Sequence, residues 1–318
     1  MKLISVVMPS YNRADLVGKA IDSVLTQKVD ADIELLIGDN CSTEDMKPVY
    51  EQYMQKYPGK ITVYYRDHNV GIASNWAQLI LACKGEYVCN CDNDDFWHNP
   101  NKLQIQLDYM ESHPACNVLF SQYTIYKRQT GEKTDSGISY DKKIPLYKTL
   151  WGSKAPFHIS SMMFRREFVV EHVPFEDFIK YEFSVQDWPF YILLSRYTAF
   201  DLIDDNLSTF VIHGSSFTNP PDYDTFSKRL SKDYEVVKYL CKKFPDWYEM
   251  ETDEDWEKYA NRLLLGLAYR KNDYTKAHQF AKKSYQTSLK EKCAMNWVTF
   301  KAYVLMAWIK RKIKGDKA

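Results

Sequence analysis

The sequence predicts an α/β fold: a mixed sheet flanked by helices, followed by a C-terminal helical region. Two observations predict this class. Strand and helix patterns alternate through the first hundred residues, which is typical of parallel strands joined by crossover helices. After Asn219-Pro220-Pro221 the composition changes to helices rich in Lys, Tyr and Leu. We therefore expect one domain over residues 1–220 and a helical appendage over residues 221–318.

The first four strands are predicted from short apolar or β-branched runs that end at polar or turn residues. The run at residues 4–8 ends at Pro9, and the run at residues 33–37 ends at Gly38-Asp39. Between the strands, apolar side chains recur at helical spacing. The predicted strands cover residues 4–8, 33–37, 61–65 and 87–91, and the predicted helices between them cover residues 14–27, 44–57 and 74–83.

The second half of the chain is less regular. Further strands are predicted at residues 118–120, 160–164, 199–203 and 207–212, and a helix at residues 187–195. The polar segment 131–143 is expected to be a mobile loop or a hairpin. Residues 260–285 have the period of a helical hairpin with its turn at residues 271–273, which looks like one tetratricopeptide-type unit. Because such units need stacked neighbours, a single copy is weak evidence for an array.

Composition excludes several classes of protein. Lys and Arg together number 42, as do Asp and Glu, so no net charge favours nucleic acid as a partner. The seven cysteines contain no CxxC pair, which indicates free thiols in a reduced, cytoplasmic compartment. The apolar run at residues 3–8 is too short for a signal peptide, and no eighteen-residue apolar stretch predicts a membrane span.

The most informative segment is the acidic run that follows the fourth strand. Asp92, Asp94 and Asp95 lie within four residues of one another. Like charges this close repel unless a cation or hydrogen-bond donors lie against them. Mg²⁺ binds through one or two carboxylates together with the phosphates of a substrate. The run therefore indicates a metal site for a phosphorylated ligand; the alternative is an acidic turn that caps a helix beginning near Pro100.

Polar residues also follow the first two strands, at residues 9–12 and 39–40. The carboxyl ends of parallel strands meet at one edge of a sheet, where open α/β sheets bind their ligands. We therefore expect these residues and the acidic run to form one site.

The order and spacing of these motifs resemble family 2 glycosyltransferases with a GT-A fold, over residues 1–220. The motifs that carry the resemblance are ISVVMPSYNR at 4–13, IGDNCSTED at 37–45, Asn69-Val70-Gly71 with Asn75, GEYVCNCDNDDFW at 85–97, Gln186-Asp187-Trp188 and Ile212-His213-Gly214-Ser215. Two positions depart from the family pattern: Asn40 stands where a second Asp is common, and Gln186 where Glu is usual.

The resemblance implies a role for each matching residue. Asp94, and less securely His213, would bind Mn²⁺ or Mg²⁺, and Asp187 would be the general base. The residues expected to bind the donor nucleotide are Pro9, Tyr11, Asn12, Asp39, Asn69 and Asp92. The residues expected on the acceptor side are Asp95, Trp97, His158, Ser161 and Trp188.

The implied reaction transfers a sugar from a nucleotide-diphosphate donor to a hydroxyl of a saccharide or polyprenyl-linked saccharide. The expected donor is a UDP-sugar. One base and one metal suffice for a single displacement with inversion, whereas retention would require a second carboxylate as nucleophile. The alternative is a non-catalytic sugar-nucleotide-binding or scaffold protein. A nucleotidyltransferase would carry a glycine-rich loop after the first strand, and a glycoside hydrolase would need no nucleotide pocket.

The C-terminus adds a separate prediction. Trp297, Phe300, Val304 and Trp308 recur at helical spacing, and basic residues follow at 310–314. Such a helix suits an anionic membrane surface, which would place the protein on the inner face of the plasma membrane. The alternative is a helix that packs on the preceding hairpin with a solvated basic tail.

Overall fold

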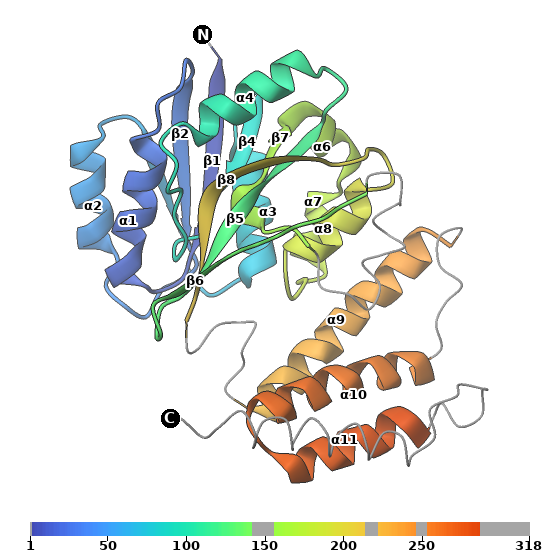
Figure 1. Cartoon of the computed structure of the whole chain (residues 1–318). Helices are drawn as coiled ribbons and strands as arrows, with labels where there is room; N and C mark the ends of the chain where they lie inside the picture. Colours follow the sequence, from blue (N-terminus) through green and yellow to red (C-terminus); the bar gives the residue numbers. More distant parts are fainter. Residues whose placement is uncertain (1, 142–155, 214–221, 246–252, 287–318) are drawn as a thin grey trace. The chain divides into compact units, whose positions relative to one another are not determined.

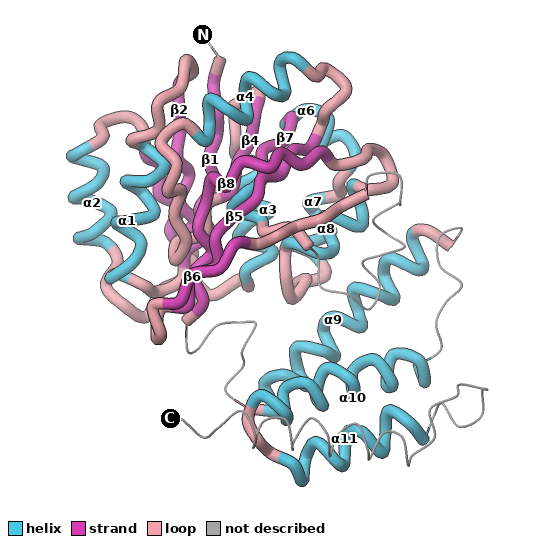
Figure 2. The backbone as a smooth tube through the Cα atoms, in the orientation of Figure 1, coloured by secondary structure: helices cyan, strands magenta, loops and turns pink. Residues whose placement is uncertain are grey.

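A computed structural model describes residues 2–141, 156–213, 222–245 and 253–286 of the chain. The chain divides into two compact units, one formed by Met1–Pro221 with Ser231–Leu240 and the other by Asp222–Leu230 with Cys241–Ala318. The first unit contains the sheet and the second contains α-helices (Figures 1 and 2).

The sheet has the strand order β3-β2-β1-β4-β7-β5-β6, with β8 paired to β5. Its strands are β1 (Leu3–Ser10), β2 (Asp32–Asp39), β3 (Ile61–Tyr65), β4 (Tyr87–Asn90), β5 (Val118–Lys127), β6 (Glu132–Asp135), β7 (Met163–Arg165) and β8 (Asp201–Ile212). The first four strands are parallel to one another, whereas β7 is antiparallel to both β4 and β5. The predicted mixed sheet is therefore confirmed.

Helices cover both faces of the sheet (Figure 1). Because side chains alternate along a strand, Ile4, Val6 and Met8 of β1 all point to one face. There they pack against α1 (Ala14–Leu25), α2 (Lys47–Lys56) and α4 (Lys102–Ser112). The other face carries α3 (Ile72–Ala82), α6 (Arg166–His172), α7 (Phe175–Lys180) and α8 (Asp187–Leu194).

An aromatic cluster fixes α8 against this second face. The fully buried ring of Trp76 on α3 lies 5.5 Å from Phe175 and 5.2 Å from Phe190, centroid to centroid. Aromatic pairs at these separations stabilise a core beyond their buried area. The cluster therefore holds the first turn of α8, where Asp187 lies, in a fixed position.

The predicted strands and helices of the first hundred residues are confirmed, with small shifts at their ends. The prediction at residues 160–164 was wrong in part, because residues 159–161 form a 3₁₀ turn, η1 (Ile159–Ser161), and only Met163–Arg165 form a strand. The two strands predicted at 199–203 and 207–212 are halves of β8. Its register against β5 shifts between Ile203 and Asn206, as at a β-bulge.

The second unit has a small apolar core of its own. Phe226 and Leu230 of α9 (Tyr223–Lys243) pack against Leu264 and Leu267 of α10 (Asp253–Arg270). The predicted turn is confirmed: Asn272 has a left-handed φ of 55°, and the backbone N–H of Lys276, in the first turn of α11 (Tyr274–Gln286), donates to Asp273 Oδ1. The likeness to a tetratricopeptide unit stays a prediction.

Three further predictions concern the periphery. β6 pairs antiparallel with β5, so residues 127–135 form a hairpin, whereas residues 142 and 143 of the expected loop lie outside the described part of the chain. The predicted C-terminal membrane helix lies wholly outside it. Among the helices that the structure describes, none is long and apolar enough to cross a bilayer. The six described cysteines are free.

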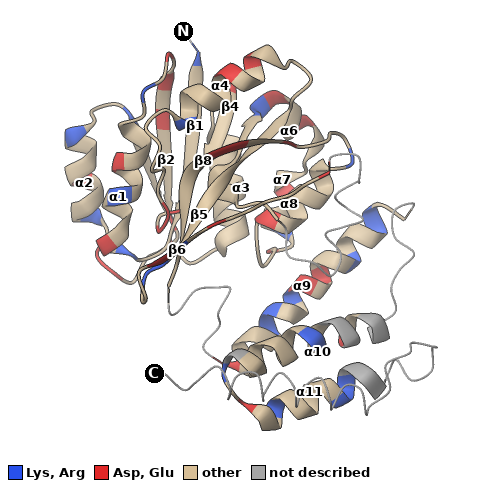
Figure 3. Cartoon of the chain, viewed as in Figure 1, with Lys and Arg blue, Asp and Glu red and all other residues tan. Residues whose placement is uncertain are grey.

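Charged side chains of both signs are interspersed on the outer helices of the first unit, and the strands are mostly uncharged (Figure 3). This distribution agrees with the zero formal charge of the sequence.

Gly85 offers a test of how β4 is joined to β1. A Cβ at this buried position would lie 2.5 Å from the backbone nitrogen of Ser5 and 2.8 Å from the carbonyl oxygen of Leu3. Because backbone cannot move aside as a side chain can, we expect Gly85→Ala to lower the free energy of unfolding by about 2–3 kcal/mol in urea titrations. The exposed neighbour provides a control, since Lys84→Ala should change it by less than about 0.5 kcal/mol. Equal stabilities would contradict this account.

Candidate active site

The carboxyl ends of β1, β2 and β4 lie side by side at one edge of the sheet. Ser10 at the end of β1 pairs with Asp39 at the end of β2, and Asn90 at the end of β4 pairs with Val7 of β1. Because β7 is antiparallel to β4, the residues that precede β7 reach this same edge. The structure therefore brings together the segments that the sequence predicted to converge.

Asp95 is the anchor of this edge. Its carboxylate is buried and accepts three hydrogen bonds: from Ser160 Oγ (2.7 Å), from His158 Nε2 (2.5 Å) and from the backbone N–H of Val211 (3.0 Å). Hydrogen bonds to ionised groups are the stronger ones. Asp95 thus links the loop after β4 to the η1 turn and to β8, and its two oxygens are engaged by the protein rather than by an acceptor.

A second set of hydrogen bonds supports η1 from the side of α4. Trp97 Nε1 donates to the carbonyl oxygen of Ser160 (2.9 Å), and Gln106 Nε2 donates to that of Ser161 (2.9 Å). Gln106 in turn accepts a hydrogen bond from the fully buried Lys102 (2.6 Å), whose ammonium lies 4.1 Å from the centroid of the Trp97 ring. The turn is therefore fixed on both sides.

The predicted acceptor contacts of Trp97 and Ser161 disagree with this arrangement. Trp97 is 3% exposed and Ser161 is fully buried, with its hydroxyl donating to the carbonyl oxygen of His158. A side chain without exposed surface cannot contact an acceptor, so these two residues support the site instead.

Asp92 and Asp94 are half-buried, whereas Asn93 between them is buried and points inward. The amide of Asn93 donates to Ser10 Oγ (2.8 Å) and to the carbonyl oxygen of Asn12 (2.9 Å). Burial and the charge of Asp95 raise the pKa of Asp92 and of Asp94 above the usual carboxyl value. A cation beside them would offset this repulsion. None of these carboxylates caps α4, whose preceding residue is Asn101, so the alternative of a capping turn is wrong.

His213 follows β8 and faces Asp94. Its Nε2 lies 3.5 Å from Asp94 Oδ2 and is buried, without a hydrogen-bond partner among the described residues. Burial and the charges of Arg13 and Arg128 lower the pKa of His213, which favours the neutral imidazole. A neutral imidazole and a carboxylate are suitable metal ligands. In the described part of the chain no three His, Cys, Asp or Glu side chains form a complete coordination set. The pair therefore fits a metal that takes its other ligands from a substrate or water.

On the nucleotide side, Pro9 and Asp39 are buried and Tyr11 is exposed. Asp39 Oδ1 accepts a hydrogen bond from the backbone N–H of Ser42 (2.8 Å). Nearby, the buried Tyr50 donates to Ser10 Oγ (2.9 Å). Asp39 also pairs in the sheet with Tyr65, whose ring is exposed, so a carboxylate and an exposed aromatic ring lie on neighbouring strands.

Three asparagines connect the loops that follow β1, β2 and β3. Asn12 Oδ1 accepts hydrogen bonds from the backbone N–H groups of Thr43 and Glu44. Asn40 Nδ2 donates to Asn69 Oδ1 (3.0 Å), while Asn40 Oδ1 accepts from the backbone N–H of Val70 (2.9 Å). Because Asn40 both donates and accepts, an Asp at this position could not make both bonds. The departure from the family pattern at position 40 therefore has a structural cause. Direct nucleotide contacts of Asn12 and Asn69 stay predictions.

Asp187 is the first residue of α8. Its Oδ1 accepts a hydrogen bond from the backbone N–H of Trp188 (2.8 Å), which orients the carboxylate. The charge of Asp187 contributes to the raised pKa of Asp92 and of His158, so it lies on the same side of the sheet as the acidic run. Trp188 and His158 are half-buried beside it, and their acceptor contacts stay predictions.

The sequence patterns do not point to Lys102 and Gln106, the polar residues that support the site. Lys102 and Gln106 bond each other four residues apart on α4. Lys102 on the apolar face of an amphipathic helix was the available signal, because a lysine is almost never fully buried without a partner.

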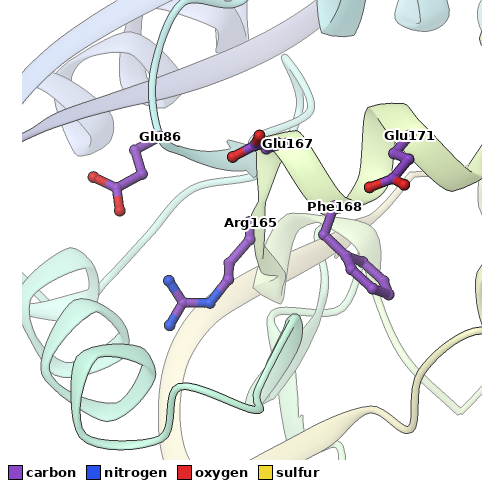
Figure 4. Close-up of a pocket in the computed structure, with 5 residues that line it drawn as sticks. All are labelled: Glu86, Arg165, Glu167, Phe168 and Glu171. Carbon is purple, nitrogen blue, oxygen red and sulfur yellow. The ribbon is translucent and has the colours of Figure 1, made fainter.

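A pocket elsewhere in the first unit is lined by Glu86, Arg165, Glu167, Phe168 and Glu171 (Figure 4). It lies at the amino end of β4, opposite the edge that carries Asp92 and Asp94. The guanidinium of Arg165 is held by the carbonyl oxygens of Cys116 and Met110 and by the hydroxyl of Tyr87. Arg165 thus stabilises the fold at this pocket.

Comparison with known proteins agrees with this geometry. Residues 5–173, more than half of the chain, match the sequence model of glycosyl transferase family 2. The chain belongs to this family. The match includes the loops that follow β1 and β2, the acidic run and η1.

A curated bacterial protein is similar to part of this chain. TuaG of Bacillus subtilis (strain 168), provisionally named a teichuronic acid biosynthesis glycosyltransferase, is 34% identical over 123 residues, which cover 39% of this chain and 47% of TuaG. The chain spans about half the length of the curated relatives it matches.

Two solved structures share the fold. S. aureus TarS 1–349 in complex with UDP-GlcNAc has a TM-score of 0.52 at 15% identity, covering 90% of this chain and 92% of that one. The mannosyltransferase PcManGT of Pyrobaculum calidifontis, in complex with GDP-Man and Mn²⁺, has a TM-score of 0.54 at 12% identity, covering 96% and 79%. The predicted GT-A fold is therefore confirmed.

Asp95→Asn tests the anchor. The new NH₂ group either faces the backbone N–H of Val211, which can only donate, or requires Ser160 and His158 to accept hydrogen bonds that they now donate. We expect the free energy of unfolding to fall by about 3 kcal/mol, measured by urea denaturation. Asp108→Asn, at an exposed position on α4, should change it by less than about 0.5 kcal/mol. An Asp95→Asn variant as stable as Asp108→Asn would contradict the anchoring role.

The titration of His158 gives an independent test. Burial alone would lower its pKa, but the charge and hydrogen bond of Asp95 outweigh burial and raise it. The pair therefore adds stability that is fully present below about pH 6.5, the unfolded value, and that is lost as the pH rises through the higher folded pKa. We expect NMR titration to give a midpoint above about 6.5 for His158. Ser160→Ala, which keeps the charge of Asp95, should leave the midpoint high, and Asp95→Asn should lower it. An unchanged His158 midpoint in Asp95→Asn would contradict the pairing.

Proposed function

We propose that the protein is an inverting, metal-dependent glycosyltransferase of surface polysaccharide synthesis. It moves a hexosyl or N-acetylhexosaminyl group from a nucleotide-diphosphate sugar to a hydroxyl of a saccharide or lipid-linked saccharide. The expected donor is a UDP-sugar. One observation carries the proposal. Asp94 faces the buried Nε2 of His213 at 3.5 Å, and this nitrogen has no hydrogen-bond partner among the described residues.

Asp94 and His213 would hold the divalent ion, Mn²⁺ or Mg²⁺. When bound, the ion would neutralise the diphosphate and so stabilise the leaving nucleotide. The Mn²⁺ in the complex of PcManGT supports this assignment. Asp92, held by the amide of Asn90 (2.8 Å), would contact the ribose or a water beside the ion.

The nucleotide would bind over β1 and β2. The exposed ring of Tyr11 offers a surface on which a base can stack, and the Asp39 carboxylate can accept a hydrogen bond from a base N–H or a ribose hydroxyl. The UDP-GlcNAc complex of TarS supports a uridine nucleotide.

Asp187 would act as the general base. One of its oxygens is oriented by the N–H of Trp188, and the other has no partner in the described part of the chain. It can take the proton of an acceptor hydroxyl as that oxygen attacks the anomeric carbon. The carbon–oxygen bond to the diphosphate breaks in the same step, which inverts the configuration. The name of TuaG supports a polysaccharide acceptor.

The test separates donor binding from chemistry. Calorimetry should detect binding of at least one of UDP-glucose, UDP-galactose, UDP-GlcNAc and GDP-mannose in the presence of Mn²⁺, and chelation should weaken it strongly. We expect Asp94→Asn to reduce this affinity by roughly 10- to 100-fold, because it removes an ionic metal ligand. Asp187→Asn should leave donor affinity within about threefold of wild type and slow sugar release from the donor by roughly 10²- to 10⁴-fold.

Asp108→Asn serves as the control and should match the wild type in both measurements. A folded wild-type protein that bound none of the four donors with metal would overturn the proposal and favour the scaffold alternative.

A further inference from the structure

Asn93 is the middle residue of the acidic run, between Asp92 and Asp94. Its uncharged amide adds nothing to the negative charge that would bind a cation. The carboxylates on either side of it are half-buried, whereas Asn93 itself is buried. The contacts of this amide therefore show what holds the two carboxylates in place.

The amide of Asn93 bonds the chain at the end of β1. Its Nδ2 donates to Ser10 Oγ at 2.8 Å and to the carbonyl oxygen of Asn12 at 2.9 Å. An amide NH₂ group has two hydrogens to donate, and two acceptors are present. These acceptors are 83 and 81 residues away in the sequence, so the bonds join two distant segments.

The first acceptor, Ser10, lies at the carboxyl end of β1 and is 2% exposed. Its hydroxyl also accepts a hydrogen bond from the hydroxyl of Tyr50 on α2, at 2.9 Å. Ser10 and Asp39 are partners in the parallel pairing of β1 with β2. The bond from Asn93 therefore ties the acidic run to the part of the edge that carries Asp39.

The second acceptor, the carbonyl group of Asn12, belongs to a loop that is itself held in place. The side chain of Asn12 accepts from the backbone N–H groups of Thr43 and Glu44, and its backbone N–H donates to Ser42 Oγ at 2.7 Å. Asn12 has a left-handed φ of 60°, which asparagine adopts more readily than most residues. Through this carbonyl, the acidic run is also tied to the loop after β2.

We propose that Asn93 is a positioning residue. Its amide holds the acidic run against the ends of β1 and β2, so that an ion on Asp94 meets the diphosphate of a nucleotide bound beside Asp39. This inference rests on the proposed function. A divalent ion such as Mg²⁺ requires its ligands at about 2 Å, so a small shift of the acidic run would separate the ion from the diphosphate. Neither Asn93 nor Ser10 needs to contact the ion or the nucleotide.

The quantity that tests this role is the metal enhancement of nucleotide binding. It is the dissociation constant of a nucleoside diphosphate in EDTA divided by its dissociation constant in saturating Mn²⁺, both from calorimetry. The ligand is UDP or GDP, whichever the wild type binds better. We expect Asn93→Ala to reduce the enhancement roughly tenfold to thirtyfold, and Ser10→Ala, which removes one of the two bonds, roughly threefold to tenfold. In Asn93→Ala the dissociation constant in EDTA should stay within about twofold of wild type, because the groups that would contact the nucleoside are unchanged.

The double variant Ser10→Ala/Asn93→Ala distinguishes positioning from a general loss of structure. If both residues act through the same hydrogen bond, the double variant should lose no more enhancement than Asn93→Ala alone. Ser5→Ala is the matched control, since Ser5 is another buried serine of β1 whose hydroxyl makes two hydrogen bonds, with Glu34 and Gly85, at the opposite end of the strand. It should lower the Tm of the free protein, as Ser10→Ala does, and leave the metal enhancement unchanged.

Three results would overturn the inference. The first is a wild-type enhancement in Asn93→Ala, which would make the amide a purely structural contact. The second is a double variant in which the two single losses multiply. The third is an equal loss in Ser5→Ala, because any destabilised variant would then behave alike. If the wild type binds neither nucleotide, or binds no more tightly with Mn²⁺ than in EDTA, the proposed function fails first, so the two failures are distinguishable.

Discussion

The edge of the sheet that carries the acidic run depends on a single buried carboxylate. Asp95 accepts hydrogen bonds from a side chain of η1, from the ring of His158 and from the backbone of β8. These segments are 63 to 116 residues away in the sequence. The backbone N–H of Asp92 also reaches Ser160 Oγ at 3.1 Å. The hydrogen bonds of Asp95 therefore fix the loop after β4, and with it the positions of Asp92 and Asp94.

The acidic run divides its residues between two tasks. Asp92 and Asp94 remain accessible, while Asn93 and Asp95 turn inward and bond the protein. The segment is a turn, closed by a hydrogen bond from the backbone N–H of Asp95 to the carbonyl oxygen of Asp92 (3.0 Å), and the turn separates the inward from the accessible side chains. The cost of gathering three carboxylates is limited because protein donors match the charge of one of them, Asp95.

Much of the fold could be predicted because the first hundred residues carry local patterns of strand and helix. The convergence of Asp39, Asp92 and Asp94 on one edge followed from the parallel order of those strands. Other features could not be predicted, because their causes are distant in sequence. The pattern at residues 160–164 predicts a strand, yet residues 159–161 form a turn held by Asp95, Trp97 and Gln106. Trp97 and Ser161 were assigned to the acceptor from their positions in a motif, and only burial shows that they face the interior.

The reversed direction of β7 has a consequence for how such a protein can diversify. Strands β1, β2 and β4 leave the sheet at the active-site edge, whereas the chain enters the sheet there through η1 and β7. The segment that leads into η1 can therefore change in length or composition while the parallel strands keep their register. Changes in the chain that precedes η1 would in this way leave the residues that follow β1, β2 and β4 in place.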